Sequence, residues 1–298
     1  GVIDALAARW AVAARVGRRE DMEDAHCVGQ ASVPAHAVAA LGKTLATFAV
    51  FDGHMNAVAS TFAAKAWEAA LQEALVASCR AGDAAEDMVG AALIAALAAV
   101  EANLEAAHTG DAAGGTTAVV AVLYAPPGSR EVRCSVANVG DSRAAVVDAA
   151  GGCFWLSVDH SPYDADERER IRAAGGFVDG DGRVMGKLGV ARALGDFTLA
   201  PSVSSEPSLQ HTTLPPCVSL VLACDGVWDV MTNAVLAGLV ASSSEVDECA
   251  GRIRDASYAI GSGDNISVLV VRVDADSTSN SRLGGADAES DSTSDSTS

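Results

Sequence analysis

Apolar and polar residues follow one another along this chain in two patterns, and each pattern predicts a different element. Short apolar runs at 9–17, 45–51 and 219–224 end in turn residues, which is typical of buried β-strands. Two longer stretches instead repeat large apolar residues every three or four positions, which predicts amphipathic helices that pack on a sheet. The repeated residues are Trp67, Leu71 and Leu75 in the first stretch, and Leu93, Leu97, Val100 and Leu104 in the second.

Four short apolar segments between residues 117 and 158 are separated by turn residues and predict antiparallel hairpins. Downstream, 164–176 predicts a charged helix, 233–243 and 246–263 predict further helices, and 265–273 predicts a closing strand. Helices grouped between hairpins favour an α+β layered sandwich over a parallel sheet built from βαβ units.

The composition changes near residue 276. Residues 276–298 consist of Ser, Thr, Asp and Gly with almost nothing apolar, so they cannot bury enough surface to offset the entropy lost on ordering. We therefore predict one domain over 1–275 and a disordered tail over 276–298.

Charge and cysteine content narrow the functional class. Lys and Arg number 20 against 39 Asp and Glu, a net charge of −19, so the surface should repel nucleic acid and anionic membranes. The seven cysteines form no C-x-x-C pair, as in a reduced intracellular protein of the cytoplasm or nucleus. The longest uncharged apolar run, 89–100, is too short to span a bilayer.

Carboxylates stand where predicted strands begin or end. Asp52 and Asp225 each follow an apolar run and precede a glycine, Asp264 precedes the last strand, and Glu23 and Asp24 lie between strand candidates. Packed strands can bring such ends together, and clustered carboxylates raise one another's pKa unless cations neutralise them. Oxygen ligands favour Mg²⁺ or Mn²⁺. Taken singly, each acid would more often be a surface turn residue.

Other phosphate chemistries lack their residues. His26-Cys27 resembles a cysteine phosphatase loop, but Val33 stands where that loop needs an arginine. The stretch 140–144, "GDSRA", lacks the final glycine of a nucleophile elbow, and no G-x-x-x-x-G-K-[ST] loop occurs.

Eight stretches in order, from about residue 10 to 273, make the chain resemble the metal-dependent type 2C serine/threonine protein phosphatases, most closely their plant-type branch. They are "GRREDMEDAH" (17–26), "FAVFDGH" (48–54), "GGTTAVVAVL" (114–123), "VANVGDSRAAV" (136–146), "LSVDHSPYDADERERIRAAGGFV" (156–178), "ARALGDF" (191–197), "ACDGVWDVMTN" (223–233) and "GSGDNISVLVV" (261–271).

The resemblance implies a four-layer αββα sandwich of two antiparallel sheets flanked by helices, with a small flap at about 160–195. It also implies two Mn²⁺ or Mg²⁺ ions at one end of the sheets. By motif, Asp52 would be the bridging ligand, Gly53 a carbonyl ligand, Asp225 and Asp264 the other direct ligands, Glu23 and Asp24 holders of metal-bound water, and Asp141 and Asp229 ligands of a third ion.

The same resemblance implies a reaction in which a hydroxide shared by the two ions attacks phosphorus directly. Arg19 would bind the substrate phosphate, and His54 would protonate the departing serine or threonine oxygen. The substrates would be phosphorylated proteins, and the enzyme would act as a monomer.

Three departures from the family pattern keep other hypotheses open. Met55-Asn56 replace two glycines that usually follow Asp-Gly-His, Ala191 replaces a usual serine, and the flap has no tryptophan, so control by hormone receptors is not inferred. The first departure favours the main alternative, a pseudophosphatase that binds phosphoproteins without turnover. A hydrolase of small phosphate esters is the third hypothesis.

Overall fold

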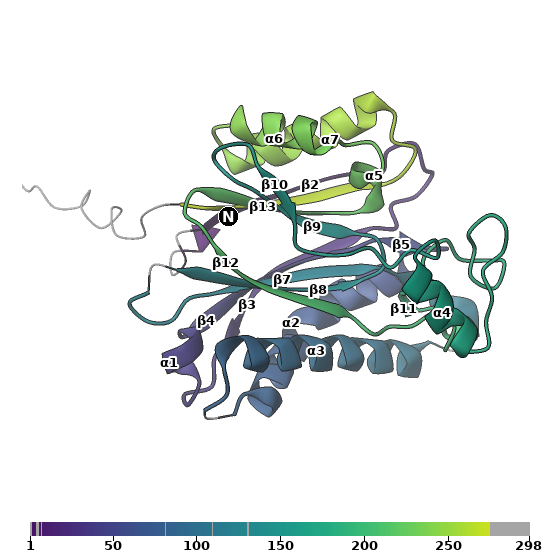
Figure 1. Ribbon diagram of the computed structural model, residues 1–298, viewed down its shortest axis with the longest axis horizontal. Helices are drawn as coiled ribbons and strands as arrows, with labels where there is room; N and C mark the ends of the chain where they lie inside the picture. Colours follow the sequence, from purple (N-terminus) through teal and green to yellow (C-terminus); the bar gives the residue numbers. More distant parts are fainter. Residues whose placement is uncertain are drawn as a thin grey trace, which may run out of the picture.

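Two antiparallel sheets stack face to face, with helices on both outer faces (Figure 1). The computed structural model describes residues 2–274 except residues 4, 5, 7, 81, 109 and 130. The predicted tail lies outside the described residues, so its disorder stays a prediction. The predicted α+β sandwich of antiparallel sheets is confirmed.

The larger sheet has six strands in the order β1-β2-β14-β13-β9-β10, all paired antiparallel. These strands are β1 Val2–Ile3, β2 Ala8–Arg15, β9 Arg143–Val147, β10 Cys153–Trp155, β13 Val218–Ala223 and β14 Ile266–Val273. The second sheet has five strands in the order β12-β8-β7-β4-β3, again antiparallel. These are β3 Ala25–Ser32, β4 Thr44–Phe51, β7 Ala118–Tyr124, β8 Val132–Val139 and β12 Ser208–Leu214.

Strands that are apolar on both faces explain why helices cover both sheets. In β4, Phe48 and Val50 face the core between the two sheets, whereas Leu45 and Phe51 face the helices. Side chains of a strand alternate between its faces, so an uninterrupted apolar run needs cover on both sides. Strand β14 divides its side chains in the same way.

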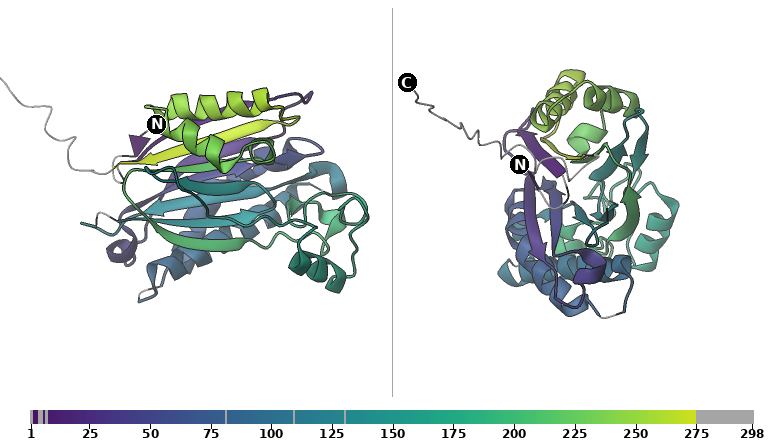
Figure 2. Two further views of the ribbon diagram at one scale, coloured as in Figure 1. Left: turned by 45° about the horizontal axis from the view of Figure 1, so that its top comes forward. Right: turned by 90° about the vertical axis from the view of Figure 1, so that its left-hand side faces the viewer.

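Helices α2 (Val58–Ser78) and α3 (Ala85–Ala107) pack together against the five-stranded sheet, and α6 (Asn233–Ala241) and α7 (Val246–Ile260) cover the six-stranded sheet (Figure 2). The short helix α1 is Val38–Leu41. By length and composition α3 could cross a membrane, but half of its most apolar window is buried inside the protein, where it lies in the core with α2.

A smaller subdomain stands at one end of the sheets, where β5, β11 and α4 appear together (Figure 1). The short strands β5 (Gly53–His54), β6 (Gly115–Thr116) and β11 (Leu194–Gly195) form a three-stranded sheet in the order β11-β6-β5. Helix α4 (Ala165–Ala173) lies within the predicted flap, which has a small apolar core of its own around Ile171 and Val184.

Two sequence expectations about strands were wrong or incomplete. The segments before and after 140–142 do not form a hairpin, because β8 pairs with β7 and β12 whereas β9 pairs with β13 and β10. The chain crosses from one sheet to the other at Gly140, whose φ is +97°. The edge strand β12 was not predicted, because its sequence, Ser-Leu-Gln-His-Thr-Thr-Leu, is polar and largely half-buried.

Candidate active site and metal centre

The predicted acids come from strand ends of both sheets. Asp52 follows β4 and Asp24 precedes β3 in the five-stranded sheet, whereas Asp264 precedes β14 in the six-stranded sheet. Asp225 is the first residue of the short helix α5 (Asp225–Trp228), which begins just after β13. The sandwich therefore brings together acids that lie as many as 240 positions apart in the chain, as the Asp24–Asp264 interaction shows.

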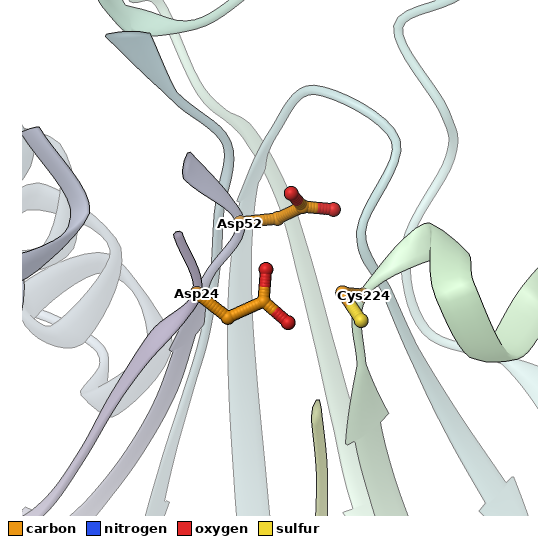
Figure 3. Close-up of side chains that lie close together, drawn as sticks. All are labelled: Asp24, Asp52 and Cys224. Atoms are coloured by element: carbon orange, nitrogen blue, oxygen red, sulfur yellow. The ribbon is translucent and has the colours of Figure 1, made fainter. Parts of the chain in front are cut away.

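Asp24, Asp52 and Cys224 form the centre of this group (Figure 3). One ligand atom from each lies within 4.8 Å of the others, and the two carboxylates point toward the gap that Cys224 faces. Sequence reasoning missed Cys224, although its position beside Asp225 was a signal. Its Sγ accepts a hydrogen bond from the Ser267 backbone N–H at 3.1 Å, which ties β13 to β14.

Two buried polar atoms at this centre have no hydrogen-bond partner among the described residues: Oδ2 of Asp24 and Oγ of Ser267. An unsatisfied buried carboxylate oxygen is unfavourable, so such atoms in a native protein call for an ion or water. A cation beside Asp24 and Asp52 would satisfy this need, and the residues present therefore fit a metal site.

Burial and mutual repulsion raise the pKa values of the clustered carboxylates. Burial is the largest cause for each, and the neighbouring carboxylates add to it. The pKa of Asp24 is raised to about 6, as is that of Asp225, and the pKa of Asp141 is raised to about 7. The pKa of Asp52 is raised well above its usual value by burial and then by Asp24 and Asp225.

The other predicted metal residues surround this centre. The negative charges of Asp264 and Asp229 each raise the pKa of Asp225. The charge of Asp141 likewise raises the pKa of Asp52. Asp229 is exposed and also lies near Arg143 and Asp159. Glu23 is half-buried, and the contacts that fix it are made by its backbone, whose N–H donates to Asn265 Oδ1 at 2.7 Å.

Gly53 is a position where no larger residue fits. A Cβ there would overlap the Glu23 carbonyl oxygen and the Ser60 hydroxyl, which are themselves hydrogen-bonded to each other. The glycine thus lets the Asp52–His54 turn pack directly against the loop that carries Glu23 and Asp24.

Asn265 holds that same loop from the other sheet and was also missed. Its side-chain amide donates to the carbonyl oxygens of Val16 and Asp21 at 2.8 and 2.9 Å, in addition to accepting from Glu23. One side chain at the start of β14 therefore makes three hydrogen bonds to the loop that presents Arg19, Glu23 and Asp24.

Arg19 lies at the rim of the acidic group. Its Nη2 pairs with Asp264 Oδ2 at 2.5 Å, and its side chain is 55% exposed. The neighbouring Arg18 instead donates to the Ser262 carbonyl at 2.7 Å and lies over the Tyr258 ring. Of the two arginines, Arg19 is therefore the one that pairs with an acid of this group.

His54 contacts an acid that sequence reasoning gave no role. Its Nε2 lies 2.6 Å from Oδ2 of Asp196, the aspartate of the "ARALGDF" stretch. Near it, the Gly195 N–H donates to Glu101 of α3, whose pKa is raised to about 7, chiefly by burial.

The two residues that replace the usual glycines, Met55 and Asn56, both fit the turn that follows His54. Met55 has a φ of +70° and is 67% exposed, so this residue adopts a conformation that favours glycine. Asn56 accepts a hydrogen bond from the Val58 N–H at 2.9 Å, at the first residue of α2. Trp228 is buried and packs edge-on against Trp155, as expected for a core residue.

Comparisons with known proteins agree with this geometry. The family model described as Protein phosphatase 2C matches residues 9–266. The chain is 34% identical over 270 residues to "Probable protein phosphatase 2C 59" of Arabidopsis thaliana, covering 90% of this chain and 80% of the relative. It is 35% identical over 277 residues to "Probable protein phosphatase 1N" of Mus musculus, covering 88% of this chain and 64% of the relative.

Among solved structures, a phosphatase from a pathogenic strain of Toxoplasma gondii superposes with a TM-score of 0.74 at 25% identity, over 90% of this chain and 93% of that one. Most of the relatives named protein phosphatase 2C are plant proteins, in keeping with the plant-type resemblance. The chain belongs to the protein phosphatase 2C family, the metal-dependent phosphatases that act on phosphoserine and phosphothreonine in proteins.

Proposed function

We propose that this chain hydrolyses phosphoserine and phosphothreonine in proteins with the help of two divalent cations, Mn²⁺ or Mg²⁺. The observation that carries the proposal is the group Asp24, Asp52 and Asp225. Their pKa values are raised by burial and by one another, and no cationic side chain in the described part of the chain hydrogen-bonds to them. Such a group is expected to bind cations supplied from solution.

The oxygen-rich donor set favours hard cations over zinc. Asp52, Asp225, Asp264 and the Gly53 carbonyl would hold two ions directly, Glu23 and Asp24 would hold water around them, and Asp141 and Asp229 would hold a third ion. When bound, such ions activate water as a nucleophile and offset charge on the phosphoryl oxygens.

The chain's own residues would do the rest. Arg19 is exposed, and among the described residues it pairs only with Asp264. It would exchange this partner for the substrate phosphate, to which a guanidinium can donate two parallel hydrogen bonds. A serine or threonine oxygen leaves poorly as an alkoxide, and His54 would donate the proton that it needs. The 24% exposure of the His54 side chain leaves room for this contact.

The test is metal-dependent turnover of a phosphoserine peptide by the purified protein, after a chelator and then with added Mn²⁺. We expect turnover only with the metal and its loss in Asp225→Ala. A well-folded, metal-loaded protein without turnover would contradict the proposal. Comparing the peptide with a phosphosugar tests the hypothesis of a small-ester hydrolase.

Two observations favour the second candidate, a pseudophosphatase that binds phosphoproteins. Met55 occupies a glycine-like conformation beside His54, and Arg19 is already paired with Asp264. If this candidate is right, calorimetry will detect phosphopeptide binding that depends on Arg19, while the same preparation shows no metal-stimulated turnover.

A further inference from the structure

His54 and Asp196 form a pair that differs sharply in solvent exposure. The Nε2 and Oδ2 atoms are 2.6 Å apart, and the side chains are 24% exposed for His54 and 5% for Asp196. The histidine comes from β5, and the aspartate directly follows β11, the two outer strands of the three-stranded sheet. A buried carboxylate thus holds one edge of a ring that is itself partly exposed.

The middle strand of this sheet has a glycine where His54 and Asp196 meet. Gly115 of β6 lies opposite both His54 and Gly195 in the strand register. A Cβ on Gly115 would overlap both His54 Nε2 and the Asp196 carboxylate, so only glycine leaves space for their contact.

The backbone of Asp196 is held in place as well. The residue is left-handed, with φ +48° and ψ +36°, and its N–H donates to the Gly114 carbonyl at 3.0 Å. The preceding N–H, that of Gly195, donates to Glu101 Oε2 at 2.8 Å. Helix α3 and the residue just before β6 therefore fix the turn that aims the carboxylate at His54.

We propose that Asp196 is a positioning residue, which binds Nε2–H of His54 and thereby makes Nδ1 the nitrogen that gives its proton to the leaving oxygen. In the described part of the chain, Nδ1 makes no hydrogen bond. This inference rests on the proposed phosphatase function. It adds that Nδ1 of His54 donates the proton to the leaving oxygen and that Asp196 determines which of the two ring nitrogens does so.

The proton balance is simple. As the bond from phosphorus to the serine or threonine oxygen breaks, its electron pair stays on that oxygen, which takes the proton from Nδ1. The ring is left neutral, with its remaining proton on Nε2 toward Asp196. An acid held in the wrong tautomer or orientation would lose this function while metal and phosphate binding persisted.

Two substrates separate this role from a structural one. A phosphoserine peptide needs a protonated leaving group, whereas p-nitrophenyl phosphate releases a stable phenolate and does not. For Asp196→Asn with Mn²⁺, we expect the ratio of kcat for the peptide to kcat for p-nitrophenyl phosphate to fall by about 10²-fold, the usual contribution of an acid catalyst. His54→Gln should lower the ratio equally, and the double variant should lower it no further.

Glu167→Gln is the matched control, because Glu167 is a buried acid of the flap that pairs with arginines and not with His54. It should leave the ratio unchanged. An unchanged ratio in Asp196→Asn, or additive losses in the double variant, would overturn the proposal. Wild-type protein that hydrolyses neither substrate would instead overturn the proposed function and this inference with it.

A measurement on the wild-type protein keeps the proposal testable should Asp196→Asn fail to fold. Long-range ¹H–¹⁵N spectra of the His54 ring report which nitrogen carries the proton of the neutral form. We expect that proton on Nε2, and a proton on Nδ1 would overturn the proposal. Gly115→Ala, which crowds the pair, is expected to lower the substrate ratio as Asp196→Asn does.

Discussion

Buried acids occur both in the flap and at the sheet ends, and their neighbours shift their pKa values in opposite directions. In the flap, Glu167 accepts hydrogen bonds from Arg170 and Arg192, each with an Nε–oxygen distance of 2.9 Å. Burial alone would raise the pKa of Glu167, but the two guanidinium groups lower it overall. At the sheet ends, Asp24 and Asp52 have carboxylate neighbours instead, and their pKa values rise.

This difference distinguishes acids that stabilise the fold from acids that need a bound cation to neutralise their charge. A buried carboxylate with its own arginine is neutralised within the chain, and removing either partner leaves an uncompensated charge. A group of carboxylates without such partners destabilises the protein until a cation arrives. Substitutions in the two regions should therefore have opposite effects on stability, and only one of the two regions should control activity.

Turnover should respond most strongly to a change at Asp52. Asp52→Asn should lower metal-dependent turnover by about 10³-fold, which corresponds to roughly 4 kcal/mol, because it removes the predicted bridging ligand. The same substitution should stabilise the metal-free protein by about 1 kcal/mol, since one charge leaves the repelling group. Peptide turnover and urea unfolding in a chelator measure the two effects, and a loss of metal-free stability would place Asp52 with the structural acids.

Glu167→Ala should have the opposite effects, a large loss of stability and little change in turnover. We expect a loss of about 3–5 kcal/mol in the free energy of unfolding, because Arg170 and Arg192 would remain half-buried without an anion. Urea unfolding measures this loss. Replacing Glu167 and Arg192 together by apolar residues should restore part of the stability, and a double variant no better than Glu167→Ala would show that the pair acts chiefly through packing.

Cation binding should also distinguish the two groups of acids. Mn²⁺ at about 100 times its Kd should raise the free energy of unfolding by about 3 kcal/mol, because the ion binds the folded state alone. Calorimetry with and without a chelator should find this gain in wild-type protein and in Glu167→Gln, but much less of it in Asp52→Asn. Equal gains in all three proteins would place the ions elsewhere.

Sequence reasoning reached the acids at the sheet ends more readily than the residues that hold them. Asp52 and Asp225 stand at the ends of apolar runs, so their place at a sheet edge follows from local pattern. The contact of His54 with Asp196 joins residues 142 positions apart through a three-stranded sheet, and no local pattern marks it. The same holds for Asn265, which bonds residues more than 240 positions away.

The elements were predictable to the extent that both of their faces are apolar. Strands β4, β13 and β14 are buried along nearly their whole length and stand out as apolar runs. The edge strands β3 and β12 have half-buried and exposed residues throughout, so their sequences resemble loops. Turn residues around Gly140 predict a hairpin, but they do not reveal which sheet the next strand joins, so the crossing there is not predictable from them.

His160 extends the comparison to a buried group with neutral partners. It accepts from the Gly140 N–H at 3.0 Å and lies 2.7 Å from the Ser208 hydroxyl, and its pKa is lowered to about 4, chiefly by burial. The unfolded chain binds the proton more tightly, so this contribution to stability is present above about pH 6.5 and is lost as the pH falls toward 4.

From pH 7 to pH 5 the stability lost through His160 should be about 2 kcal/mol. Urea unfolding of wild type and of His160→Asn at both pH values isolates the effect, because other titrating groups cancel in the difference. The variant should be less stable at pH 7 and close to wild type at pH 5. A difference between the two proteins that does not change with pH would mean that His160 is not held neutral.

Two methionines with left-handed backbones, one in each region, should give the weakest effects. Met55 beside His54 has φ +70°, and Met185 in the flap has φ +53°. Replacing either by glycine relieves steric strain but adds freedom to the unfolded chain, so each variant should gain about 0.5–1 kcal/mol in stability.

Only Met55→Gly should also raise turnover of the phosphoserine peptide, because it removes an exposed side chain next to the proposed acid. Thermal unfolding and peptide kinetics on both variants measure this. Equal kinetics in the two would show that Met55 does not restrict the substrate, and the pseudophosphatase hypothesis would then lose one of its two supporting observations.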